Sequence, residues 1–175
     1  MRLDVLTQNE LRTFLNYNPE TGIFLWRDYP LPSGKARRRY GKASIGSIAG
    51  STDTYGYREI RINYKMYKAH RLAWLYVYGA WPEGEIDHAN GVPGDNRIAN
   101  LRLATRAHQN ANTRRRRDNK SGYKGVCRYG DRFHAFIGVG GGKTKYLGSF
   151  ATGQEAHAAY LDFAKKIYGE FARAA

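Results

Sequence analysis

The chain has 175 residues, of which 29 are Lys or Arg and 15 are Asp or Glu, so its formal net charge is +14 at pH 7. Hydrophobic residues make up 42% and aromatic residues 14%, which is too much for a disordered chain, and the length allows one ordinary domain or two small ones. Such an excess of positive charge on a folded protein indicates a polyanionic partner, with nucleic acid as the first expectation.

The cysteine count and the hydropathy exclude several classes of protein. A single cysteine, Cys127, excludes an internal disulfide and a zinc site built from cysteines. No apolar run approaches the roughly 20 residues that a bilayer-spanning helix needs, and no apolar signal segment follows Met1. We therefore expect a soluble, cytoplasmic protein without a membrane partner.

The beginning of the chain predicts a short helix followed by strands. Thr7-Gln8-Asn9-Glu10 fits a capping box, which opens a helix through Leu15 that stops before Pro19. Apolar and alternating runs then predict strands at residues 22–26, 46–49 and 57–64. The first of these three runs is typical of a buried strand.

The middle of the chain predicts a helix and then a strand–loop–strand–helix arrangement. Residues 68–78 have helical spacing and end at Gly79, a plausible C-cap. Short strands are expected at 84–88 and 100–103, separated by a turn-rich loop, and Thr105 is placed to cap a helix that runs to Asn112.

Positive charge is concentrated after Asn112. Residues 1–112 carry 16 Lys and Arg against 10 Asp and Glu, whereas the shorter stretch 113–175 carries 13 against 5. Residues 113–120 include four consecutive arginines (Arg114, Arg115, Arg116 and Arg117), which repel one another and are typical of a linker. One interpretation is a solvated tether, and the other adds contacts of these arginines with phosphates or the minor groove. A second basic cluster, at residues 35–42, allows the same two interpretations.

The remainder predicts a small sheet covered by one helix. Strand-like runs occupy residues 123–129, 132–139 and 143–150, joined by glycine-containing turns. Thr152-Gly153-Gln154-Glu155 forms a second capping box, and the helix it opens has an apolar stripe and ends near Gly169. Three strands and one helix leave the other face of the sheet free to meet a partner.

Asp87 and His88 are the residues that suggest chemistry. Hydrolysis of a phosphodiester needs a base that activates water and a hard cation that stabilises negative charge. A carboxylate such as Asp87 suits Mg²⁺ or Mn²⁺, and a histidine such as His88 has a pKa suited to a base near neutrality. Because neighbours on a strand point in opposite directions, both reach one site only if the strand ends or twists there.

The stretch from His70 to Asn112 resembles the HNH endonucleases, in particular the homing endonucleases of phages and introns. The matching segments are His70-Arg71-Leu72-Ala73-Trp74, Ile86-Asp87-His88-Ala89-Asn90-Gly91, Asp95-Asn96-Arg97-Ile98-Ala99-Asn100-Leu101-Arg102 and Ala104-Thr105. The resemblance implies an α+β fold with a ββα-metal core at about residues 84–112, preceded by a β-rich extension. It also implies a metal-dependent DNA endonuclease with double-stranded DNA as its partner.

The resemblance assigns roles to individual residues. Asp87 would bind a single divalent cation, Mg²⁺ or Mn²⁺, His88 would be the general base, and Asn100 would brace the loop that holds His88. The family's third signature position, a His or Asn metal ligand on the helix, corresponds to Gln109 here, with His108 as the alternative ligand. His70 is either a phosphate contact or a structural hydrogen-bonding residue.

Residues 121–172 resemble the ethylene-response-factor type (apetala-two) DNA-binding domain of plant transcription factors. The resemblance lies in Gly125-Val126, Phe133, Ala135, Ile137, Leu147-Gly148, Phe150, Glu155-Ala156, Ala159-Tyr160 and Gly169. It implies a three-stranded antiparallel sheet that enters the DNA major groove and is backed by the helix. The candidate DNA-binding side chains expected on the free face are Lys124, Arg128, Arg132, His134, Lys143, Lys145 and Tyr146.

These observations predict three parts: an HNH nuclease domain at 1–112, a basic linker at 113–120 and an apetala-two-like DNA-binding domain at 121–175. A monomer with one catalytic centre is expected to nick DNA, and a double-strand break would need a dimer or two successive events. Two alternatives stay open. One is a non-catalytic, sequence-specific DNA-binding regulator, and the other is an RNA-binding or RNA-cleaving protein, for which the sequence shows no stacking motif.

Overall fold

The computed structural model describes residues 6–28, 45–113, 115 and 118–172, and the chain divides into two compact units, residues 1–103 and 104–175. Both units combine helices with small antiparallel sheets, so the predicted α+β class is confirmed. The division places the helix expected at 105–112 in the second unit. No helix in the described part of the chain is long and apolar enough to cross a membrane.

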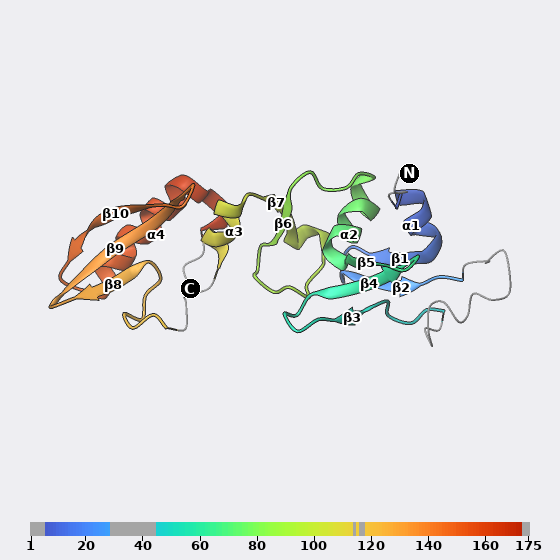
Figure 1. The fold of residues 1–175 in the computed structure, drawn as a ribbon, viewed down its shortest axis with the longest axis horizontal. Helices are drawn as coiled ribbons and strands as arrows, with labels where there is room; N and C mark the ends of the chain where they lie inside the picture. Colours follow the sequence, from blue (N-terminus) through green and yellow to red (C-terminus); the bar gives the residue numbers. More distant parts are fainter. Residues whose placement is uncertain (1–5, 29–44, 114, 116–117, 173–175) are drawn as a thin grey trace. The chain divides into compact units, whose positions relative to one another are not determined.

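The first unit is built from two helices and seven short strands among its described residues (Figure 1). In chain order these are α1 (Gln8–Phe14), β1 (Leu15–Asn18), β2 (Ile23–Trp26), β3 (Ser51–Thr52), β4 (Arg58–Ile62), β5 (Lys65–Lys68), α2 (Ala69–Tyr78), β6 (Glu85–His88) and β7 (Leu101–Ala104), with a 3₁₀ turn at Ile98–Asn100 before β7. The strands form three groups, β1–β2, β3–β4–β5 and β6–β7, and the first two groups are antiparallel.

The signals for helix ends predicted from the sequence are present. Thr7 and Glu10 form the capping box of α1, and α2 ends at Gly79, whose left-handed backbone (φ +78°) closes the helix with a hydrogen bond to Leu75. Three observed strands, β1, β3 and β5, were not predicted from the sequence. β5 follows a tight turn at Asn63-Tyr64, where both residues have positive φ without a glycine to signal it.

The prediction that residues 22–26 form a buried strand was wrong about burial. In β2 only Phe24 is fully buried, whereas Ile23 is exposed and the last two residues are half-buried. The reason is that β2 is one strand of a two-stranded hairpin, which covers the core with one face only. The run at 46–49 contributes a single bridge, between Ile48 and Leu25, rather than a strand.

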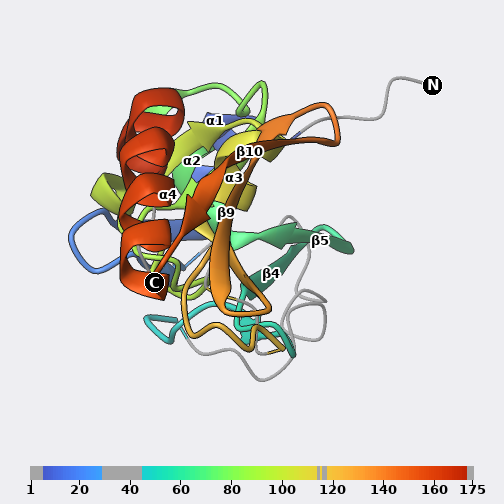
Figure 2. The same cartoon turned by 90° about the vertical axis from the view of Figure 1, so that its left-hand side faces the viewer.

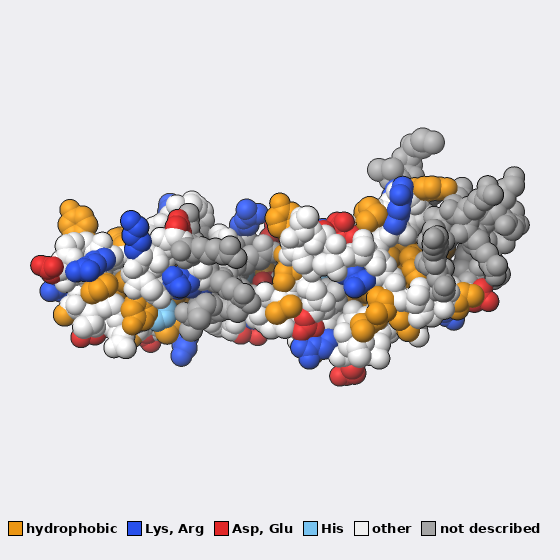
Figure 3. Space-filling model, turned by 90° about the horizontal axis from the view of Figure 1, so that it is seen from below, with side chains coloured by type: hydrophobic (Ala, Val, Ile, Leu, Met, Phe, Trp, Pro, Cys, Tyr) orange, Lys and Arg blue, Asp and Glu red, His pale blue; other side chains and the backbone are white. Residues whose placement is uncertain are grey.

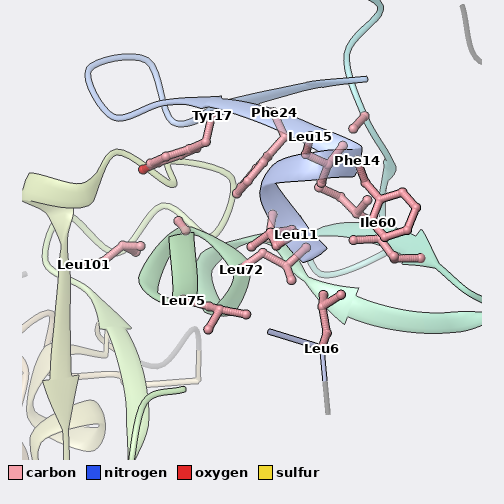
Figure 4. Packing of buried hydrophobic residues seen from close by; sticks show 14 of the residues in the cluster. Leu6, Leu11, Phe14, Leu15, Tyr17, Phe24, Ile60, Leu72, Leu75 and Leu101 are labelled. Atoms are coloured by element: carbon pink, nitrogen blue, oxygen red, sulfur yellow. The ribbon is translucent and has the colours of Figure 1, made fainter. Parts of the chain in front are cut away.

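The core of the first unit lies between α1, α2, the β1–β2 hairpin and the sheet β3–β4–β5. Figure 4 shows the side chains of the core converging from these elements, including Leu11, Phe24, Ile60 and Leu72, each of them fully buried. Leu101 of β7 and Ile86 of β6 belong to the same cluster. The strands that carry the candidate site are therefore anchored in this core.

The second unit contains a short helix, a three-stranded sheet and a long helix. Its elements are α3 (Arg106–Asn112), β8 (Val126–Tyr129), β9 (Arg132–Gly140), β10 (Lys143–Phe150) and α4 (Gly153–Tyr168), followed by a 3₁₀ turn at Gly169–Phe171. The strand order is β10–β9–β8, all antiparallel, and α4 packs along the sheet (Figure 2). The N-cap expected at Thr105 and the capping box expected at Thr152 are both present. The predicted sheet with one covering helix is thus observed.

The register of this sheet determines which side chains face α4. Val126, Ala135 and Phe133 pack with Ala156 in the core beneath the helix. Alternate positions therefore belong to the free face, and pairing across the strands places Cys127 with His134, and Tyr129 with Arg132, on that face. Arg132, His134 and Tyr146 lie on the free face, as expected.

Three of the expected free-face residues lie elsewhere. Lys145 pairs with the buried Ile137, and its Nζ lies 4.5 Å from the ring centroid of Phe163 in α4, so Lys145 is on the helix side. Arg128 pairs with Phe133 and shares the helix side by register. Lys124 precedes the sheet and donates hydrogen bonds to the carbonyls of Ala111 and Thr113, at the end of α3. Alternation along the strand places Lys145 and Arg128 on the helix side, and the carbonyls left without a partner at the end of α3 attract Lys124.

A close backbone approach in the first unit yields a stability prediction. A Cβ on Gly22 would lie 2.5 Å from backbone atoms of Asn96 and Arg97, whereas a Cβ on Gly46 would meet nothing within 4 Å, although both glycines have positive φ. We expect Gly46→Ala to cost about 1–2 kcal/mol, from the left-handed backbone alone, and Gly22→Ala to cost clearly more. The measurement is urea unfolding followed by tryptophan fluorescence, because all three tryptophans lie in the first unit. Equal losses in the two variants would contradict a tight approach at Gly22.

Candidate active site

The candidate site is built at the end of β6. Ile86, Asp87 and His88 are all buried, the first in the hydrophobic core and the other two among polar side chains. Asp87 bonds to Arg102 of the neighbouring strand, whereas His88 bonds to Asn96 of the loop that follows. The two candidate residues are thus held by different partners, one in the sheet and one in the loop.

Asn96 fixes the ring of His88. Its Oδ1 lies 3.3 Å from His88 Nε2, and its Nδ2 donates to the carbonyl of Gly94. An amide oxygen can only accept, so Nε2 of His88 carries the proton of this bond. The side chain of Asn96 is almost completely buried, at 1% exposed. Asn96 lies in a segment that resembles the family, but its burial and its bond to His88 depend on the fold and could not be predicted from the sequence.

The β1–β2 hairpin holds Asn96 from the other side. The hydroxyl of Tyr17 donates to the carbonyl of Asn96 at 2.7 Å, and the amide of Ile98 donates to the carbonyl of Pro19. Burial raises the pKa of the Tyr17 hydroxyl, so it remains a donor at any physiological pH. The N-terminal extension therefore supports the loop that positions His88.

Asn100 ties the two ends of the same loop together. Its Oδ1 accepts from the amide of Asn90, its Nδ2 donates to Asn90 Oδ1 and to the carbonyl of Asp95, and its own carbonyl accepts from the amide of Ala89. These are the bonds that bracing of the loop requires. The catalytic consequence of this bracing stays a prediction.

Two further rings surround His88. The ring of His70 meets it edge-on with centroids 5.2 Å apart, and Tyr57 lies 5.6 Å from His70 and 5.9 Å from His88. Nδ1 of His70 is buried without a hydrogen-bond partner among the described residues. The structure therefore shows no structural hydrogen bond from Nδ1 of His70 to any described residue. The position of Tyr57 was not anticipated from the sequence.

Burial keeps both histidines neutral. Desolvation, together with the neighbouring His88, Arg71 and Lys68, lowers the pKa of His70 to about 3. Burial also lowers the pKa of His88, although the bond to Asn96 and the charges of Asp87 and Asp95 act in the opposite direction. A neutral imidazole retains one lone pair, which is the form that a general base needs.

Asp87 forms an ion pair with Arg102. Nε and Nη2 of Arg102 lie 3.0 and 2.9 Å from Oδ2 of Asp87. The side chain of Arg102 is only 14% exposed and that of Asp87 only 10%. This partner was not assigned from the sequence. A cation already compensates the carboxylate, so a metal ion bound at Asp87 would replace or share this interaction.

The predicted third ligand lies on α3, in the second unit. Nδ1 of His108 accepts from the amide of Thr105 in the capping box, and its ring stacks on Phe171 with centroids 4.2 Å apart. Among the described residues no group of three or more His, Cys, Asp and Glu is arranged to hold a metal. Of the predicted ligands, the carboxylate of Asp87 and the amide of Gln109 supply the oxygen atoms that a hard cation prefers. That both bind one metal ion stays a prediction.

Most of the arginines expected to touch DNA in the linker cannot be placed. Arg114, Arg116 and Arg117 lie outside the described residues, as does the basic cluster within 35–42. Arg115 donates to the carbonyl of Asn119.

The buried histidines predict that the first unit loses stability on mild acidification. Because the folded pKa of His70 lies below the value of about 6.5 in an unfolded chain, the unfolded state binds more protons at pH values between these two pKa values. The free energy of unfolding should fall from pH 7 to pH 5, by at most about 1.4 kcal/mol per pH unit for each histidine. Urea unfolding monitored by tryptophan fluorescence measures it. The variant His70→Phe should flatten the dependence, and an unchanged slope in that variant would contradict the assignment.

Comparison with known proteins gives one match. Residues 67–111 match the family model described as HNH endonuclease, a segment that runs from β5 through α2, β6 and β7 into α3 and contains His70, Asp87, His88 and Asn100. No curated protein and no solved structure matches the chain. HNH nucleases generally use a divalent metal and act on DNA. The match confirms the prediction of an enzyme, a DNA endonuclease.

Proposed function

We propose that the chain is a metal-dependent endonuclease that nicks double-stranded DNA at a chosen site, as homing endonucleases do, with His88 as its general base. The observation that carries this proposal is the restraint on His88. Its ring is buried, neutral and bonded to an amide that is itself held by the β1–β2 hairpin. A base fixed in one orientation without a charge of its own is suited to accept a proton from water.

The hydrogen bond to Asn96 selects the reactive nitrogen. Because Nε2 of His88 donates to Asn96 Oδ1, the lone pair of the neutral ring is on Nδ1. Nδ1 is therefore the atom that removes the proton from the attacking water. Asn100 contributes indirectly, as a positioning residue, by bonding both ends of the loop that carries Asn96.

A divalent cation would be held by Asp87, with Gln109 or His108 of α3 as the further protein ligand. When bound, such a cation stabilises negative charge on the phosphate and on the leaving oxygen. Gln109 is the better candidate, because Nδ1 of His108 already caps α3 and its ring stacks on Phe171. Mg²⁺ and Mn²⁺ both suit oxygen ligands of this kind.

The second unit would bind the substrate. Its sheet, backed by α4, has the arrangement that the resemblance to the apetala-two domain implies, and its strands contain Lys and Arg but no Asp or Glu. Figure 3 shows basic and hydrophobic side chains interspersed on this unit, at the left of the view. Within this proposal, a single site in a monomer produces a nick, and a double-strand break requires a second copy or a second event.

Loss of the base is the direct test of catalysis. His88→Gln should lower the rate of nicking of supercoiled plasmid in Mg²⁺ or Mn²⁺ by about 10²–10⁴-fold, because the glutamine amide does not accept a proton near neutral pH. The matched control is His157→Gln in α4, which should nick at the wild-type rate. The assignment of His88 fails if both variants cut equally well. The proposal of a nuclease fails if the wild type leaves the plasmid intact in both metals.

The ion pair gives a test of metal binding that does not depend on cleavage. Arg102→Ala leaves Asp87 buried without this guanidinium and should destabilise the first unit by about 3 kcal/mol or more in EDTA. If Asp87 is a ligand, Mn²⁺ should raise the melting temperature of Arg102→Ala more than that of the wild type. The double variant Asp87→Asn/Arg102→Ala is the control and should not respond to Mn²⁺. Equal metal shifts in Arg102→Ala and in this control would remove Asp87 from the metal site.

A further inference from the structure

The free face of the β8–β9–β10 sheet is a continuous cluster of aromatic rings. Tyr129, His134, Phe136 and Tyr146, called here the aromatic face, come from all three strands. Neighbouring ring centroids are 5.5 Å apart for Tyr129–His134, 5.6 Å for His134–Tyr146 and 5.3 Å for Phe136–Tyr146. Tyr129 is 77% exposed and Tyr146 is 51% exposed. The rings are on the side away from α4, so the helix does not cover them.

Large exposed rings are costly unless they meet a partner. Rings grouped on a rigid sheet lose little conformational freedom on binding, because the strands already hold them. Next to Phe136 and Tyr146, the register pairs Gly138 with Thr144, two small residues. The aromatic face therefore offers flat apolar ring surfaces that are exposed to solvent.

The charge of the surrounding sheet identifies the class of partner. Strands β8, β9 and β10 contain four Lys and Arg residues and no Asp or Glu. Of these four residues, Arg132 pairs with Tyr129 on the free face, where it also donates to Ser149. Positive charge beside stacked rings suits a partner that carries both flat bases and phosphates, which is a nucleic acid.

The same face is poorly equipped to recognise the base edges of a duplex. Recognition of base edges in the major groove relies on Arg, Asn and Gln, and these three strands contain no Asn or Gln. Lys145 and Arg128 lie on the helix side, which leaves Arg132 as the arginine of the free face. Stacking, in contrast, needs only exposed rings and is indifferent to base identity.

We propose that the aromatic face binds unpaired bases of single-stranded DNA, which stack on Tyr129 and Tyr146 while Arg132 contacts the phosphate backbone. The choice of DNA over RNA rests on the proposed function as a DNA endonuclease. The stacking mode follows from the rings and their register and does not depend on catalysis. The sheet would thus hold a locally opened strand rather than enter the groove of an intact duplex.

The test is binding of the full chain to a fluorescein-labelled single-stranded 20-mer of DNA in EDTA, measured by fluorescence anisotropy. Tyr146→Ala and Tyr129→Ala should each weaken binding by about tenfold, whereas Tyr146→Phe, which keeps the ring, should bind like the wild type. Tyr55→Ala is the matched control, because Tyr55 is 80% exposed but belongs to the first unit. The loss in Tyr146→Ala should leave the slope of log K against log salt unchanged, whereas Arg132→Ala should make that slope shallower by about 0.7.

Three outcomes would overturn the proposal. In the first, an intact duplex of the same sequence binds as tightly as the single strand, and Tyr146→Ala weakens the binding of both equally. In the second, a single-stranded RNA binds more tightly than the DNA. In the third, the alanine variants are folded and bind the oligonucleotide with wild-type affinity. Circular dichroism tests whether the alanine variants are folded. We expect them to fold, because both tyrosines are exposed. Because EDTA prevents cleavage, this experiment is independent of the nuclease. His88→Gln should bind the oligonucleotide normally, so the failure of one proposal does not imply failure of the other.

Discussion

The candidate site depends on one buried amide. Asn96 is 1% exposed, and its oxygen and its NH₂ group bond to His88 and Gly94, while its carbonyl accepts from Tyr17. A buried amide without partners is costly, so these bonds restrict the loop to a single arrangement. Tyr17 is itself packed against Phe24, with ring centroids 4.6 Å apart. The orientation of His88 is therefore linked, through Asn96, to the hydrophobic core of the first unit.

Much of the framework could be predicted from the sequence, because capping and turn chemistry act locally. The capping boxes at Thr7 and Thr152, the N-cap at Thr105 and the C-cap at Gly79 are all present. Long-range contacts were beyond the sequence. The ion pair between Asp87 and Arg102 joins residues on two paired strands, and the contact between His70 and His88 joins a helix to a strand. In the same way, the register of the sheet, and not its composition, determines that Lys145 lies on the helix side.

The site combines a neutral pair of rings with a compensated charge. His70 and His88 are buried edge-to-face. For His88, desolvation outweighs the charges of Asp87 and Asp95 that favour its protonation, whereas for His70 both desolvation and the neighbouring charges lower the pKa. Asp87 is close enough to raise the pKa of His88, yet its own charge is balanced by Arg102. The charge of Asp87 favours the imidazolium form of His88, and burial opposes it. Arg102 also occupies the carboxylate oxygen that a metal bound at Asp87 would use.

The net charge of +14 has a different meaning in each unit. In the first unit, Lys68 forms ion pairs with Asp53 and Glu59, and Arg97 forms one with Asp95, so these cations are compensated within the fold. The strands of the second unit have no acidic residue with which to do this. An uncompensated cation beside an exposed ring is stabilised most by a ligand that supplies both a phosphate and a flat apolar surface. A nucleotide with an unpaired base meets both requirements, whereas in an intact duplex the bases are already stacked on each other.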